Sequence, residues 1–158
     1  MVTNADVKRA GAGFGQRYGL AILRIMVGVF FLFQGIDRLR WLIDSGPLTA
    51  QLAQFMKTAT PLNRWYVERL LPGGPLFARL VVLGELFTGV GLMTGVWTRL
   101  VAGSAFLMVL NFHVAGGTLF HYAFLTDGYG LPVLGTLLAL MLGGGRLPWS
   151  VWKPRKAV

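Results

Sequence analysis

The chain has 158 residues, of which 54% are hydrophobic and 13% charged, and its mean hydropathy is +0.60. Soluble domains carry about 25% charged residues, so this composition excludes an ordinary soluble domain and indicates an integral membrane protein. The net charge of +9 does not indicate a nucleic-acid partner, because most basic residues flank apolar segments, where they anchor helices and attract anionic lipid. The absence of cysteine excludes disulfides, thiolate catalysis and thiolate-bound metal centres within the chain.

The apolar segments predict an all-α fold, an integral membrane four-helix transmembrane bundle. A helix needs about 20 apolar residues to cross the hydrocarbon core, and these continuous runs lack the alternation of barrel strands. We expect spans near residues 18–40, 76–96, 100–116 and 130–145. They form one transmembrane domain, residues 17–146, between a flexible basic arm (1–16) and a basic tail (147–158).

The first outer loop contains a predicted amphipathic helix. Its polar side carries Gln51, Gln54 and Lys57, and its apolar positions at helical spacing are Leu48, Leu52, Phe55, Met56 and Ala59. This pattern favours a short helix that lies in the membrane interface and is ended by Pro61.

The distribution of Lys and Arg favours a cytoplasmic location for both termini. The arm and the tail are basic, whereas the loop of residues 117–129 has neither Lys nor Arg. The first outer loop also carries basic residues, which reduces the contrast, but the positive-inside rule still gives this orientation.

Glu85 lies near the middle of the second predicted span. A buried charge costs several kcal/mol unless it is paired or protonated. With a rise of about 1.5 Å per residue, Arg24 of the first span lies at a depth from which its side chain can approach Glu85. The sequence therefore predicts an Arg24–Glu85 pair, which is either a purely structural tie or part of a functional site.

A second polar group is expected toward the outer ends of the spans, formed by Gln34, Asp37, Arg38, Arg79, Asn111 and His113. The simple interpretation of Asp37 and Arg79 is a rim ion pair worth at most about 1 kcal/mol. The functional interpretation is a polar pocket open to the outer face, where arginine binds an anion and His113 transfers protons.

We predict no metal site. His113 and His121 lie about 12 Å apart along a helix, and a histidine pair at metal-ligating spacing is missing. The glycines predict close helix contacts instead: Gly91 and Gly95 form a GxxxG step, and Gly28 and Gly35 share one face of the first span. Whether these contacts lie within the bundle or between subunits is left open by the pattern.

Several motifs resemble those of the DoxX family of membrane proteins. Arg24 followed by Gly35-Ile36-Asp37-Arg38-Leu39 is similar to the family's Arg and GxxKL signature, with Arg38 in place of the usual lysine. Glu85 followed by the segment 95–100 is similar to its second motif. The segments 111–113 and 143–146 resemble its later landmarks, so the likeness extends over residues 17–146.

The resemblance implies a multi-pass protein of a bacterial or archaeal inner membrane. The family includes the small subunit of thiosulfate:quinone oxidoreductase and proteins that assemble with partners in redox defence. One hypothesis is therefore a subunit of a quinone-linked redox system, in which Glu85 or His113 handles protons and Arg24 or Arg79 binds an oxoanion or a semiquinone. The alternative is a non-catalytic accessory or scaffolding subunit of a larger membrane complex. Neither hypothesis requires a covalent cofactor, and both involve membrane lipids and other protein subunits as partners.

Overall fold

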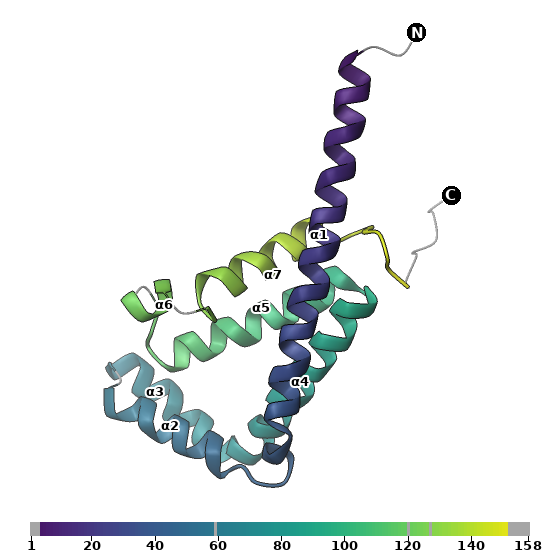
Figure 1. Ribbon diagram of the computed structural model, residues 1–158. Coiled ribbons are helices and arrows are strands. Elements are labelled where there is room, and N and C mark those ends of the chain that lie inside the picture. The colour runs from purple at the N-terminus through teal and green to yellow at the C-terminus, as the bar shows by residue number, and fades with distance from the viewer. Residues whose placement is uncertain (1–3, 59, 120, 127, 152–158) are drawn as a thin grey trace.

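The computed structural model describes residues 4–58, 60–119, 121–126 and 128–151, with side chains from residue 13 onward except at positions 58, 62 and 123. Every regular element in this part of the chain is a helix, which confirms the predicted all-α fold (Figure 1). The elements are α1 (Asn4–Asp37), η1 (Leu39–Leu42), α2 (Gly46–Thr58), α3 (Pro61–Leu70), η2 (Leu71–Gly73), α4 (Gly74–Thr94), α5 (Thr98–Ala115), α6 (Tyr122–Thr126) and α7 (Leu131–Gly143).

Within the described residues, three segments are long and apolar enough to cross a membrane: Gly13–Asp37, Asn63–Thr94 and Thr98–Ala115. The fourth predicted span corresponds to α7, which is apolar but has only 13 residues. At about 1.5 Å per residue, a helix of that length is roughly 20 Å long, shorter than the hydrocarbon core. The predicted span boundaries otherwise agree closely with the ends of α4 and α5.

The N-terminal segment differs from the prediction. Residues 4–16, expected as a flexible arm, are the first turns of α1, which continues without interruption to Asp37. No proline interrupts this segment, so the backbone hydrogen bonds of the span extend through it despite its glycines. Most of the predicted tail, residues 152–158, lies outside the described residues.

Helices α1 and α4 pack antiparallel with their backbones in near contact. A Cβ atom added at Gly28 would lie 2.8 Å from Met93, and one added at Gly89 would lie 2.6 Å from the backbone nitrogen of Leu32. Only glycine permits such an approach, so these residues set the register of the two helices. The glycine contacts of α1 and α4 therefore lie within the bundle.

The chain reverses tightly between α4 and α5. Gly95 and Trp97 both have left-handed backbone conformations, with φ of 74° and 46°. Helix α5 then packs against α7 around a core that includes Val101, Ala105 and Leu137. This turn and residues 146–151 lie toward one end of the bundle, and α2, α3 and α6 lie toward the other (Figure 1).

The segment predicted as the first outer loop forms two helices where one was predicted. The expected amphipathic helix is α2, and it ends before Pro61 as predicted. Pro61 also begins α3, because proline suits the first helical turn and Thr60 caps it through its side chain. Leu48, Leu52 and Val67 are buried against α4 and α5, so the α2–α3 hairpin packs on the bundle as a cover. Ala59, the last predicted apolar position of α2, lies outside the described residues.

Candidate functional site

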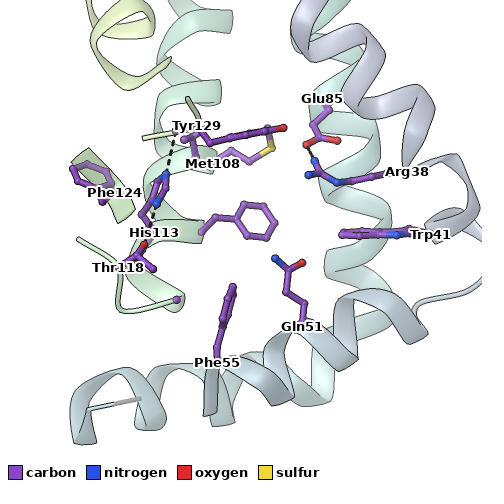
Figure 2. Close-up of a pocket in the computed structure, with 13 residues that line it drawn as sticks. Arg38, Trp41, Gln51, Phe55, Glu85, Met108, His113, Thr118, Phe124 and Tyr129 are labelled. Carbon is purple, nitrogen blue, oxygen red and sulfur yellow. Dashed lines mark hydrogen bonds and ion pairs between the residues drawn. The ribbon is translucent and has the colours of Figure 1, made fainter. Parts of the chain in front are cut away.

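A cavity of about 270 Å³ lies between the α2–α3 cover and the helices α4 and α5 (Figure 2). Its lining is predominantly apolar and aromatic, with a few polar side chains. The lining residues are Arg38, Trp41, Gln51, Phe55, Glu85, Met108, Val109, Phe112, His113, Gly116, Thr118, Phe124 and Tyr129. Concave, mostly apolar sites with a few well-placed polar groups are typical of small-molecule binding.

An ion pair between Arg38 and Glu85 forms one side of this cavity (Figure 2). Glu85 is only 2% exposed, and its Oε1 atom accepts from the guanidinium of Arg38. The other carboxylate oxygen, Oε2, is buried without a hydrogen-bond partner in the described part of the chain. The guanidinium also lies 5.3 Å from the ring centroid of Trp41 and 6.0 Å from that of Tyr129, within the range of cation–π attraction. A cation, an unused acceptor and two aromatic rings therefore meet at one place.

The predicted Arg24–Glu85 pair is wrong. Arg24 is fully buried near the middle of α1, where it donates to Ser150 Oγ at 2.5 Å and to the carbonyl of Trp149 at 3.1 Å. The register of α1 against α4 places Arg24 beside Gly95, whose missing side chain makes room for the guanidinium. Gly95 is ten residues after Glu85, which corresponds to about 15 Å along α4, so Arg24 cannot reach that carboxylate.

His113 lies on the other side of the cavity, beside Thr118 and Phe124 (Figure 2). Its Nε2 is 3.1 Å from the carbonyl oxygen of Tyr129, which can only accept, so Nε2 carries a hydrogen. Its Nδ1 is 3.0 Å from Thr118 Oγ1, a group that can donate or accept. The hydroxyl of Thr118 is also 3.4 Å from the carbonyl of His113. Both the neutral and the protonated imidazole are therefore satisfied here, since the Thr118 hydroxyl can turn from Nδ1 to the carbonyl.

The predicted outer polar pocket does not form as one site. Asp37 and Arg79 are exposed, and no ion pair joins them within the described residues. Arg79 donates instead to the carbonyl of Leu42 at 3.2 Å. Gln34 is half-buried and Asn111 is exposed, where it accepts from the hydroxyl of Tyr66. None of these four residues lines the cavity. Of the polar residues predicted to gather, Arg38, Glu85 and His113 do line it.

The sequence did not predict the partner of Glu85 or much of the aromatic lining of the cavity. Arg38 was expected in the outer polar group and in a family motif, but not as the partner of Glu85. Gln51 and Phe55, four residues apart on α2, were assigned to a membrane-interface helix but face the cavity. The usable signal was the position of Arg38, which continues the helical spacing of Arg24, Gly28 and Gly35 just past the end of α1.

Together, the apolar helices and this arrangement define a multi-pass, all-helical membrane protein with lipid-contacting faces and a buried ion pair beside a cavity. The DoxX family model matches residues 19–121, well over half of the chain. The protein belongs to the DoxX family. The matched region includes Arg38, Glu85 and His113. Comparisons with curated proteins and with solved structures gave no match.

Proposed function

We propose that this DoxX-family protein is a membrane subunit of a quinone-linked redox system and that its cavity binds the quinone ring. The observation that carries the proposal is the Arg38–Glu85 pair in the wall of an aromatic-lined cavity of about 270 Å³. An apolar cavity of about 150 Å³ is enough to bind benzene, so the larger volume here is adequate for a substituted ring.

The residues present suit the chemistry of a quinone. Trp41, Phe55 and Tyr129 supply aromatic surface for a flat ring. Arg38 has several N–H donors, of which one serves Glu85, so others are available for a quinone carbonyl oxygen. The Glu85 Oε2 atom supplies an acceptor for a hydroquinone hydroxyl. A buried acceptor without a partner costs about 1–3 kcal/mol, and a bound hydroxyl would recover part of that cost.

Two groups at the cavity can hold protons. Reduction of a quinone to a hydroquinone takes up two electrons and two protons. Glu85 and His113 lie on opposite sides of the cavity, and His113 keeps its hydrogen bonds in either protonation state. We assign the electrons to a partner protein. In this proposal Arg38 takes the ligand-binding role predicted for Arg24 and Arg79, which bond to other parts of the chain.

Binding of a tailless quinone tests the proposal. The probe is 2,3-dimethoxy-5-methyl-1,4-benzoquinone, measured by equilibrium dialysis against the purified protein in mild detergent. We expect Glu85→Gln and Arg38→Gln to weaken binding at least tenfold and Arg38→Lys, which keeps the cation, to retain most of it. The matched control is Glu68→Gln on the exposed face of α3. Equal binding by wild type and Glu85→Gln, with both proteins monodisperse, would contradict the proposed site, as would absence of binding to wild type.

A second candidate is an accessory subunit that holds a larger membrane complex together. The observation in its favour is the N-terminal part of α1, which projects beyond the other helices (Figure 1). A Cβ atom added at Gly13, Gly15 or Gly19 would meet nothing within 4 Å, so this surface is open to a partner. Gly15→Trp should then abolish co-purification of the partner, whereas Glu85→Gln and Gly135→Trp, also at an open position, should not.

We further propose a bacterial or archaeal inner-membrane location with both termini in the cytoplasm. The basic residues at the two ends of the chain support this orientation. Reporter fusions at each terminus, active only in the cytoplasm, test it. An inactive reporter at either terminus would contradict the orientation.

A further inference from the structure

A second cavity, of about 160 Å³, lies against the first and is lined almost entirely by apolar side chains of α2, α3, α4 and α5. We propose that it holds the start of an apolar tail carried by the ligand whose ring occupies the first cavity. The inference rests on the proposed function, and it specifies the ligand as a membrane-borne, tailed quinone in place of a water-soluble one.

The two cavities share part of their lining. Met108 and Phe112, one turn apart on α5, line both of them. Methionine is unbranched and has three rotatable side-chain bonds, so it changes shape easily. Gly84 of α4 faces the sulfur of Met108, where an added Cβ would lie 3.0 Å away. A change of the Met108 rotamer can therefore join the two cavities without movement of the helices.

The second cavity also reaches the lipid-facing side of the bundle. Leu80 of α4 lines it and is 52% exposed, and its neighbours Leu76 and Leu83 on the same helix are exposed to a similar degree. These residues lie in a segment long and apolar enough to span a membrane. A ligand that enters from the bilayer would place its ring beside Arg38 and leave its tail directed toward lipid.

The size and chemistry of the second cavity limit its occupant. An apolar cavity of about 150 Å³ is filled by a molecule as small as benzene, so this one fits about one five-carbon isoprenoid unit. Among the described residues that line it, Asn111 is the only polar one, and it is already bonded to the hydroxyl of Tyr66. The lining therefore favours hydrocarbon over a polar group.

Val81→Phe tests the tail site because Val81 is 8% exposed and lines the second cavity but not the first. The matched control is Val90→Phe, the same change on the same helix at a position that is 53% exposed. Ala115→Leu fills the second cavity from α5 and serves as an independent variant. The probes are the tailless quinone used above and the same ring with a single isoprenoid unit, with free ligand measured in the same detergent.

We expect Val81→Phe and Ala115→Leu to weaken binding of the tailed quinone at least tenfold and to change binding of the tailless quinone less than twofold. Val90→Phe should bind both as wild type does. Tailless binding that depends on Glu85, with tailed binding unaffected by Val81→Phe and Ala115→Leu, would overturn the tail site alone. Failure of wild type to bind either probe would overturn the tail site and the proposed function together. If binding depends on the tail but is unchanged in Glu85→Gln, the apolar tail site is supported. The placement of the ring in the first cavity is then overturned.

Discussion

Arg38, the residue that follows the end of α1, forms an ion pair with Glu85 in the middle of α4. The pair joins a residue at a helix end to one deep in a span, because α1 ends level with the centre of α4. Glu85 is almost fully buried, whereas the side chain of Arg38 is 25% exposed. The guanidinium can therefore keep contact with water or a ligand while it neutralises the carboxylate.

Removal of Arg38 should cost more than removal of both partners. Arg38→Met leaves a buried carboxylate without a cation, which costs about 3 kcal/mol of unfolding free energy, whereas Arg38→Met combined with Glu85→Gln leaves no uncompensated charge. Thermal unfolding in detergent would compare the two variants with Arg40→Met, a neighbouring exposed arginine, as the control. Equal melting temperatures for the single and double variants would contradict the expected penalty for a buried carboxylate without its cation.

The segment of residues 148–151 should be required for stability because Arg24 depends on it. Arg24 donates to Ser150 and Trp149, and the backbone N–H of Val151 donates to the carbonyl of Thr94. A chain ended at Leu147 leaves the buried guanidinium without these acceptors, so we expect a loss of at least about 3 kcal/mol. A chain ended at Val151, which keeps these bonds, is the control for the thermal unfolding measurement. Arg24→Met should partly rescue the shorter chain, and absence of rescue would contradict this explanation.

Substitution by alanine should have opposite effects on stability at two glycines that lie within helices. Gly89→Ala places a Cβ 2.6 Å from the Leu32 backbone and should force α1 and α4 apart, at a cost of about 1–3 kcal/mol. Gly135→Ala in α7 meets nothing within 4 Å and should stabilise by up to about 1 kcal/mol through higher helix propensity. The measurement is the unfolding midpoint in a denaturing detergent. Equal effects at the two positions would contradict the close contact of α1 with α4.

The α2–α3 cover should loosen when its polar tie to α5 is removed. The hydroxyl of Tyr66 donates to Asn111, and Asn63 of the same helix donates to the carbonyl of Val114 at 2.5 Å. Tyr66→Phe removes one bond, worth about 1 kcal/mol, so hydrogen exchange in α3 should be faster and that in α4 unchanged. Tyr122→Phe, at a side chain that is 81% exposed, is the matched control. Unchanged exchange in α3 would show that the Tyr66–Asn111 bond does not hold the cover.

The sequence by itself determined the fold class, the approximate bounds of α4 and α5, the amphipathic helix α2 and the position of a lone carboxylate, Glu85, inside an apolar helix. These follow from local properties, because continuous apolar runs, helical spacing and a lone carboxylate can each be recognised within one segment. The second helix of the cover was missed because its apolar pattern is weak and Pro61 signals an end and a beginning equally well.

Only the tertiary structure decided which arginine meets Glu85 and which side chains share the cavity. Arg24 lies in α1 and Arg38 follows its end fourteen residues later, about four helical turns, so spacing alone makes both candidates. The choice depends on the axial offset between α1 and α4. That register is set by the contacts of Gly28 and Gly89 across the interface. A register is a property of two surfaces in contact, so no pattern within either helix specifies it.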